Sequence, residues 1–287
     1  MARLLIAFMR FLAWWPLPVL RALGAALGLL LYALAHERRR VADINLALCF
    51  PQWRAAHRRQ VLRRHFVCVM QSLLDRAWLW HAPVSVLRRR LQVTGDVQAL
   101  QQAGGVVMFA PHFVGLDAGG VALTVVLGQP MASIYVPQRG QALDDWVRNG
   151  RNRNGLNRLY ERHEGVKAIL AGLRQGDKLY LLPDMDFGAA ESVFVNFFGV
   201  PAATLPSLSR FARLGRARVV SGATRMTRSG YCIDIGQPWA NFPSEDVMAD
   251  TQRMNDHLQT LVQSMPEQYY WVHKRFKTRP AGSPAVY

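Results

Sequence analysis

The chain has 287 residues, of which 51% are hydrophobic and 19% are charged, and its formal net charge is +16. This hydrophobic content excludes an intrinsically disordered chain, and the length suits one large domain with an appendage. A strong positive charge indicates an anionic partner, such as a membrane surface, nucleic acid, or an acidic protein or substrate. The three widely spaced cysteines match neither a zinc pattern nor a disulfide framework, which suits a reducing compartment.

The first forty residues are dominated by apolar side chains. The best apolar run covers residues 19–35, which is near the short limit for a helix that crosses a membrane. The His-Glu-Arg-Arg-Arg segment at 36–40 places this flank in the cytoplasm under the positive-inside rule. A signal peptide fits poorly because arginines follow the apolar run, and a buried core helix is the other alternative. We therefore expect residues 1–40 to form a membrane anchor, spanning or deeply embedded, with a basic flank.

Residues 41–90 are predicted to be helical and strongly basic. Between Trp53 and Trp80, apolar residues recur at roughly helical spacing with arginines between them. This pattern fits an amphipathic helix with a solvated basic face, or a helix that lies against anionic lipid head groups. The neighbouring apolar segment favours the second interpretation. Signatures of nucleic-acid-binding folds are missing from the sequence, so no nucleic acid partner is expected.

From about residue 92 onward, short apolar segments alternate with helical patterns. Strands are predicted at 106–110, 131–136, 178–182, 217–224 and 231–235, with a further apolar segment at 192–198. Helices are predicted at 116–127, 143–151, 166–173, 205–214 and 246–265, with a polar loop at 149–158. This alternation predicts an α/β fold, with a mostly parallel or mixed sheet flanked by helices, over residues 91–287. Residues 41–287 would form one catalytic-type domain behind the anchor.

The segment 105–117 (GVVMFAPHFVGLD) contains the strongest candidate for chemistry. His112 follows a predicted strand, and Asp117 lies five residues later at the start of a predicted helix. A carboxylate that contacts the imidazole would fix its tautomer and leave the other nitrogen free as a general base. Because the segment lacks Ser, Thr and Cys, the proton would come from a substrate. The alternative is a structural loop histidine that is hydrogen-bonded to an aspartate at a helix start.

Other polar residues follow neighbouring predicted strands. Asp184 and Asp186 could bind a metal together, but a turn or the lining of an acceptor pocket is the favoured interpretation. Arg139 and Arg151 either belong to a solvated face or hold phosphates or a developing oxyanion near His112. Neither a nucleotide-binding glycine loop nor a metalloprotease motif is present, so we expect no bound cofactor and no metal.

Several longer segments identify a family. The chain resembles the late acyltransferases of lipid A biosynthesis, the lauroyl and myristoyl transferases, within the lysophospholipid acyltransferase superfamily. The resemblance is carried by NLALCFP at 45–51, the His112–Asp117 motif, LPDMDFG at 182–188, SVFVNFFGVPAAT at 192–204 and PEQYYWVHKRFKTRP at 266–280. It covers nearly the whole chain, including the anchor.

The resemblance implies transfer of a fatty acyl group from acyl carrier protein to a hydroxyl of a lipid A precursor. His112 would deprotonate the hydroxyl and Asp117 would orient and charge the imidazole, while Arg151 is a candidate for the family's arginine after the motif. It also implies a place at the cytoplasmic face of the inner membrane of a Gram-negative bacterium. An acyltransferase for another bacterial lipid is one alternative, and a non-catalytic basic protein that binds membrane or nucleic acid is another.

Overall fold

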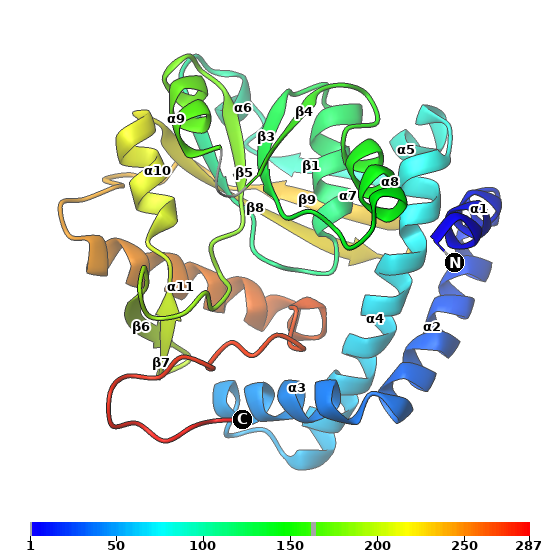
Figure 1. Cartoon of the computed structure of the whole chain (residues 1–287), viewed down its shortest axis with the longest axis horizontal. Coiled ribbons are helices and arrows are strands. Elements are labelled where there is room, and N and C mark those ends of the chain that lie inside the picture. Colours follow the sequence, from blue (N-terminus) through cyan, green and yellow to red (C-terminus); the bar gives the residue numbers. More distant parts are fainter. Residues whose placement is uncertain (1, 162–164) are drawn as a thin grey trace.

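A seven-stranded mixed sheet forms the centre of the α/β part of the computed structural model, which describes residues 2–161 and 165–287 (Figure 1). The strand order is β1-β9-β8-β2-β5-β3-β4, and β6 pairs with β7 in a separate antiparallel ribbon. The strands are β1 (Leu91–Gly95), β2 (Val106–Phe109), β3 (Met131–Tyr135), β4 (Asn157–Glu161), β5 (Lys178–Leu181), β6 (Val193–Phe197), β7 (Val200–Thr204), β8 (Arg218–Thr227) and β9 (Gly230–Ile235).

Helices cover both faces of this sheet. They are α1 (Ala2–Leu12), α2 (Leu17–Leu34), α3 (His36–Cys49), α4 (Ala55–His81), α5 (Val84–Arg90), α6 (Gln98–Gln101), α7 (Leu116–Val121) with the π-helical turn η1 (Ala122–Val126), α8 (Gln141–Arg151), α9 (Val166–Arg174), α10 (Ser207–Gly215), α11 (Val247–Ser264) and the 3-10 turn η2 (Pro266–Gln268). The predicted fold class, a mixed sheet flanked by helices, is confirmed.

The central strand β2 explains how the two faces are covered. Its four residues are all buried, and successive side chains of a strand point to opposite faces. Val106 and Met108 join one hydrophobic cluster with residues of α4, α5 and α7, whereas Val107 and Phe109 join another with residues of α9, α10 and α11. A strand that is buried on both faces therefore appears in the sequence as a continuous apolar run.

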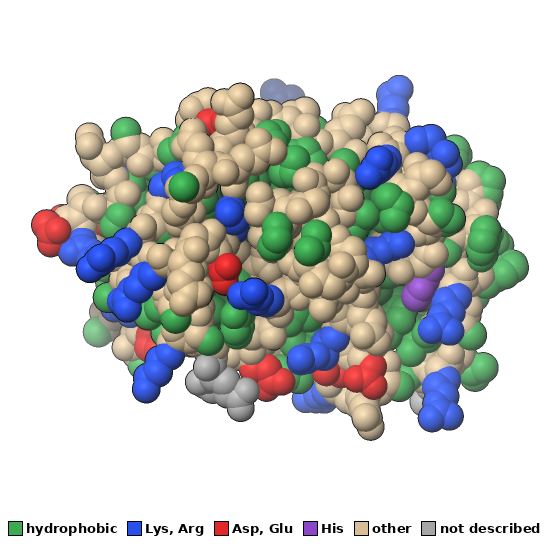
Figure 2. All heavy atoms as spheres, turned by 90° about the horizontal axis from the view of Figure 1, so that it is seen from above, with side chains coloured by type: hydrophobic (Ala, Val, Ile, Leu, Met, Phe, Trp, Pro, Cys, Tyr) green, Lys and Arg blue, Asp and Glu red, His purple; other side chains and the backbone are tan. Residues whose placement is uncertain are grey.

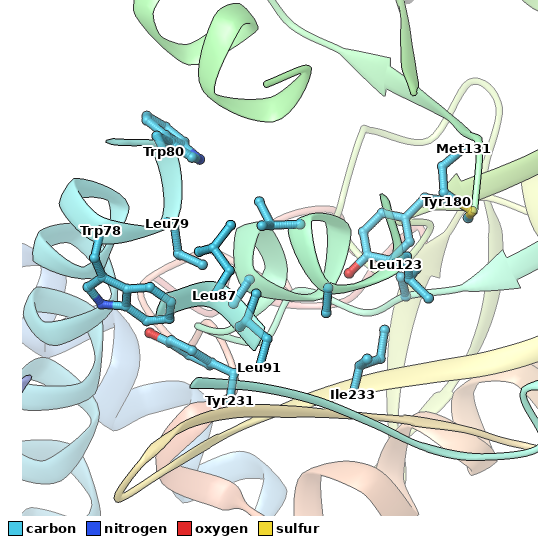
Figure 3. Packing of buried hydrophobic residues seen from close by; sticks show 14 of the residues in the cluster. Trp78, Leu79, Trp80, Leu87, Leu91, Leu123, Met131, Tyr180, Tyr231 and Ile233 are labelled. Atoms are coloured by element: carbon cyan, nitrogen blue, oxygen red, sulfur yellow. The ribbon is translucent and has the colours of Figure 1, made fainter. Parts of the chain in front are cut away.

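Helix α4 is part of the core rather than a surface appendage. Trp78, Leu79 and Trp80 lie near its end and are buried, and Trp78 and Tyr231 of β9 lie with tilted rings 6.1 Å apart (Figure 3). Ile233 extends the same cluster along β9. The second half of α4 thus packs on one face of the sheet, while the exposed arginines of this helix, Arg59, Arg63 and Arg64, lie in its first half.

The predicted strands at 106–110, 131–136, 178–182, 217–224 and 231–235 all form, with ends that shift by up to three residues. Strands β1, β4 and β7 were not predicted. Strand β4 begins inside the predicted loop 149–158, whereas Arg151 ends α8, in agreement with the predicted helix at 143–151. Both β1 and β4 are edge strands of the large sheet and β7 pairs with β6 alone, so none of them needs a continuous apolar run.

The N-terminal apolar segment forms two helices that pack against α4 (Figure 1). Within the described residues, α2 is the one helix that is long and apolar enough to cross a membrane. Four of its residues are nevertheless buried in the protein, namely Leu17, Leu20, Gly24 and Gly28. The basic flank predicted at 36–40 forms the first turns of α3.

Candidate acid–base site and cavity

His112 lies in the loop that leaves the carboxyl end of β2. The chain turns at Pro111, and the carbonyl oxygen of His112 accepts a hydrogen bond of 3.0 Å from the backbone N–H of Tyr270. Phe113 forms an isolated antiparallel bridge with Tyr269, and the backbone N–H of Val114 donates to the carbonyl of Gln268 at 2.9 Å. The C-terminal segment therefore holds the histidine loop from one side.

The imidazole of His112 contacts Asp184. Strands β2 and β5 are parallel neighbours, with Phe109 opposite Leu181. Each strand is followed by a proline, and the polar residue lies three positions after the paired residue: His112 after β2 and Asp184 after β5. His112 Nδ1 lies 2.7 Å from Asp184 Oδ1, and the backbone N–H of His112 donates to Oδ2 at 3.0 Å. Because a carboxylate accepts, Nδ1 carries the proton, which leaves Nε2 unprotonated in the neutral ring.

Burial alone would raise the pKa of the Asp184 carboxyl, since this side chain is fully buried. The charge and hydrogen bonds of His112, together with the Arg275 guanidinium, hold that pKa below its usual value. Arg275 is also buried, and it donates at 2.8 Å to the carbonyl of Ala203 and to Thr204 Oγ1. The carboxylate under His112 is thus ionised at neutral pH.

Asp117 does not make the predicted contact with the His112 imidazole. Its carboxylate accepts from Arg76 Nε at 2.8 Å and from Arg151 Nε at 2.9 Å, whereas Asp184 contacts the imidazole. Burial raises the pKa of Asp117, but Arg151 and Arg76 outweigh it and lower this pKa to about 2. Asp117 contacts these arginines because it lies in the first turn of α7, between α4, which carries Arg76, and α8, which carries Arg151.

Asp186 shapes a turn and Arg139 lies on the exposed surface, and each of these is one of the two alternatives expected from the sequence. Asp186 is buried, and its carboxylate accepts from the backbone N–H of Gly188 and from the backbone N–H and hydroxyl of Thr278. It thereby ties the loop after β5 to the C-terminal segment and is not among the side chains that line the cavity described below. Arg139 lies in an exposed loop and also does not line this cavity.

A cavity of about 820 Å³ adjoins His112. Helix α4 supplies part of its wall through side chains at i, i+3, i+4 and i+7, namely Val69, Ser72, Leu73 and Arg76. The other lining residues are mostly apolar, with His112, Asp117, Arg151 and Tyr180 among the polar ones. This size lies within the range of small-molecule sites, and apolar walls with few polar groups suit a ligand with a hydrocarbon part.

Arg76 is a site residue that the sequence interpretation missed. It was grouped with the other basic residues of the segment 41–90, yet its guanidinium forms a 2.7 Å ion pair with Asp117 in the cavity. Its spacing from Val69, Ser72 and Leu73 is that of one helix face, so helical periodicity contained the signal. Among residues 2–161 and 165–287, no group of three or more His, Cys, Asp or Glu side chains could hold a metal ion.

The segments that carried the family resemblance meet beside this site. Asn45 at the end of α3 is buried and donates to the carbonyls of Trp271 and His273 at 2.7 Å and 2.8 Å. The backbone N–H of Asp186 in turn donates to His273 Nε2 at 3.1 Å. Residues 45–51, 182–188 and 266–280 thus form one packed unit, although they lie far apart in the sequence.

The fold and the site define an α/β protein in which a buried carboxylate holds a histidine in the wall of a largely apolar cavity. Comparisons with known proteins identify the family. The sequence profile of the family described as bacterial lipid A biosynthesis acyltransferase matches residues 1–278. The chain is 33% identical over 282 residues to a lipid A biosynthesis acyltransferase of Haemophilus influenzae, a match that covers 96% of this chain and 87% of that protein.

Two further proteins are similar to the chain. It is 31% identical over 283 residues to the lipid A biosynthesis lauroyltransferase of Escherichia coli, covering 95% of this chain and 90% of the relative. Among solved structures, a 1-acyl-sn-glycerophosphate acyltransferase from Thermotoga maritima matches with a TM-score of 0.39 and 12% identity, over 86% of this chain and 96% of that one. The chain belongs to the bacterial lipid A biosynthesis acyltransferase family and is an acyltransferase.

Proposed function

We propose that this chain transfers a fatty acyl group from the thioester of acyl carrier protein to a hydroxyl of a lipid A precursor. The observation that carries the proposal is His112 in the wall of the apolar cavity, held from behind by the buried Asp184. The names of the relatives, which include a lauroyltransferase and a palmitoleoyltransferase, support the substrate class. The charge of +16 suits both an acidic carrier protein and a phosphorylated lipid acceptor.

His112 would act as the general base. Its Nε2 would take the proton of the acceptor hydroxyl while this oxygen attacks the thioester carbonyl carbon. Collapse of the tetrahedral intermediate would break the carbon–sulfur bond, and the imidazolium would return the proton to the leaving thiolate. Asp184, which contacts Nδ1, would orient the ring and stabilise the imidazolium.

Arg76 and Arg151 would supply positive charge beside this chemistry. Both guanidiniums reach the cavity and are held by Asp117, whose two oxygens each take one arginine. Fixed cations at that place suit a developing oxyanion or the phosphate groups of the acceptor. In this proposal Asp117 is a positioning residue for the arginines, and the carboxylate that acts on His112 is Asp184.

We further propose that the protein works at the cytoplasmic face of the inner membrane. The apolar helices α1 and α2 and the adjoining basic segment support membrane association, because arginines near an apolar surface favour anionic lipids. A lipid acceptor in the inner leaflet would then be within reach of the cavity.

The proposal can be tested with purified, detergent-solubilised protein. The donors would be acyl carrier proteins loaded with saturated chains from decanoyl to hexadecanoyl, and the acceptor would be a tetra-acylated lipid A precursor. Mass spectrometry should detect an acceptor that has gained one acyl chain with the wild type, and should not detect it with His112→Ala. Absence of product with folded wild type would reject this acceptor, and product with His112→Ala would reject the general base.

A further inference from the structure

Helix α2 has the composition of a membrane span but is docked on the protein along one face. A Cβ atom added to Gly28 would meet Val67 Cα at 2.6 Å, and one added to Gly24 would meet Gln71 Cα at 2.9 Å. The backbones of α2 and α4 are therefore as close as these glycines permit. Further along, the rings of Tyr32 and Phe66 make an edge contact with centroids 5.7 Å apart. The two helices thus run antiparallel, side by side (Figure 1).

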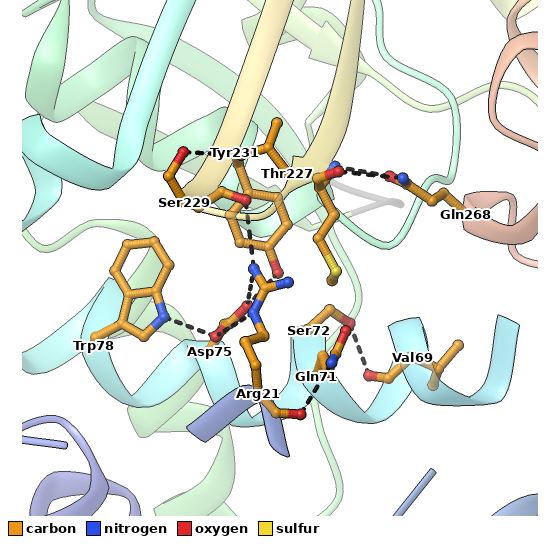
Figure 4. Close-up of polar contacts among 12 residues, drawn as sticks. Arg21, Val69, Gln71, Ser72, Asp75, Trp78, Thr227, Ser229, Tyr231 and Gln268 are labelled. Carbon is orange, nitrogen blue, oxygen red and sulfur yellow. Dashed lines mark hydrogen bonds and ion pairs between the residues drawn. The ribbon is translucent and has the colours of Figure 1, made fainter. Parts of the chain in front are cut away.

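A buried ion pair fixes the same two helices together (Figure 4). Arg21 of α2 lies 2.9 Å from Asp75 of α4 through Nη2 and Oδ2. Asp75 is completely buried, and it also accepts from the Tyr231 hydroxyl at 2.7 Å and from Trp78 Nε1 at 2.8 Å. Departure of α2 would leave Asp75 buried without its cation, which is strongly unfavourable.

The contact between α2 and α4 limits how α2 can insert into a bilayer. Helix α4 is part of the domain core, with Leu74, Ala77 and Trp78 buried against the α/β part. If α2 crossed a bilayer while docked, α4 and the sheet behind it would have to enter the hydrocarbon as well. A docked α2 can therefore present its outer face to lipid but cannot be surrounded by it.

That outer face is apolar and continues onto α1. We call it the apolar face. It consists of Leu4, Phe8 and Phe11 of α1, Trp14 in the turn after α1, and Val19, Leu29, Leu30 and Leu34 of α2, all exposed. Figure 2 shows hydrophobic side chains at the edge of the molecule where α1 and α2 lie, with Lys and Arg side chains nearby. The exposed Arg3 and Arg10 on α1 and Arg38 and Arg40 on α3 adjoin it in the sequence. An apolar face with arginines beside it fits an anionic lipid surface.

We propose that α1 and α2 lie along one leaflet of an anionic bilayer, with the apolar face inserted and neither helix crossing. The proposal rests on the membrane association proposed above and specifies its geometry. It also brings the cavity close to the membrane. Gln71 and Asp75 on one side of α4 contact α2, whereas Val69 and Leu73 on another side of α4 line the cavity. One helix thus separates the inserted surface from His112, so a lipid acceptor has a short path to it.

The topology can be tested with the full-length protein in cells. A single crossing would put the N-terminus and the domain on opposite sides of the membrane, whereas the proposed arrangement puts both on the cytoplasmic side. An epitope tag at the N-terminus should resist protease in spheroplasts and be digested in inverted membrane vesicles, as should the same tag at the C-terminus. Digestion of the N-terminal tag alone in spheroplasts would overturn the proposal. Acyl transfer and sedimentation with membranes, measured on the same samples, report separately on the proposed function.

The inserted surface can be tested with purified protein and vesicles that contain phosphatidylglycerol. Phe8→Glu with Leu30→Glu should reduce flotation with the vesicles by at least about tenfold, because two inserted apolar side chains become charged. Met248→Glu is the matched control, since Met248 is an exposed apolar residue on α11 and should leave flotation unchanged. Unchanged flotation of the double variant would overturn the proposal. A lower oligomeric mass of that variant together with unchanged flotation would assign the apolar face to a second copy instead.

Discussion

The Nδ1 atom of His112 lies 2.7 Å from Oδ1 of Asp184, and the second oxygen of the same carboxylate accepts the backbone N–H of His112. This two-point contact fixes the ring and its loop together. It arises because two parallel neighbouring strands end in register and each is followed by a proline. The carboxyl ends of adjacent parallel strands are where α/β proteins bring distant residues together.

Asp184→Asn should lower kcat by about 10²- to 10⁴-fold, because an amide can stabilise neither the tautomer nor the charge that a general base requires. The measurement is steady-state acyl transfer with one acyl carrier protein donor. Asp186→Asn serves as the control, since Asp186 binds Thr278 and does not line the cavity. Equal losses of kcat in the two variants, both folded, would reject a specific role for Asp184.

Asp117→Asn should reduce kcat/KM by about tenfold to a hundredfold, and kcat by less than Asp184→Asn does. The variant keeps the contact between His112 and Asp184 but removes the anion that positions Arg76 and Arg151. The two variants should be compared under identical conditions, with thermal melting as a check on folding. A larger loss of kcat in Asp117→Asn than in Asp184→Asn would indicate that Asp117 supports the imidazole of His112.

His65 should make the protein less stable in mild acid. Burial lowers the pKa of His65 to about 4, although its hydrogen bond to the Glu267 carbonyl opposes this shift. The unfolded chain therefore binds a proton between about pH 6.5 and pH 4 that the folded chain does not, so stability falls as the pH falls through this range. For this fully buried side chain the contribution is on the order of 3 kcal/mol.

The measurement for His65 is the urea midpoint at several pH values from neutral to about pH 4.5. His65→Asn keeps an N–H donor near the position of Nδ1, which contacts the Glu267 carbonyl, but cannot take up a proton, so its stability should depend less on pH. Identical pH dependence in both proteins would show that His65 does not cause the loss of stability.

Gly28→Ala should destabilise the protein by about 1–3 kcal/mol, because the new methyl group overlaps the backbone of α4 at Val67 and Phe66. Leu29→Ala is the neighbouring control. Its side chain is half exposed, so its effect in detergent solution should stay within about 0.5 kcal/mol. Equal melting temperatures for Gly28→Ala and the wild type would contradict the close contact of α2 and α4.

The amino-acid sequence by itself determined the periodic elements and the polar residues at their ends. The apolar run at 106–110 predicted a strand, and the prolines after β2 and β5 marked the two turns that hold His112 and Asp184. Both residues were selected from the sequence, since a strand end is a local feature. The strands β1 and β4 were missed because an edge position relaxes the need for apolar side chains.

Only the tertiary structure decided which carboxylate contacts the imidazole. Sequence spacing favoured Asp117, five residues from His112, yet the contact goes to Asp184, 72 residues away. The same holds for the ion pair of Arg21 with Asp75, which docks an apolar helix that composition alone predicts to be an anchor. The physical reason is that local spacing reflects only the backbone of one segment. Contacts between side chains depend on strand order, register and helix packing, and these are properties of the whole chain.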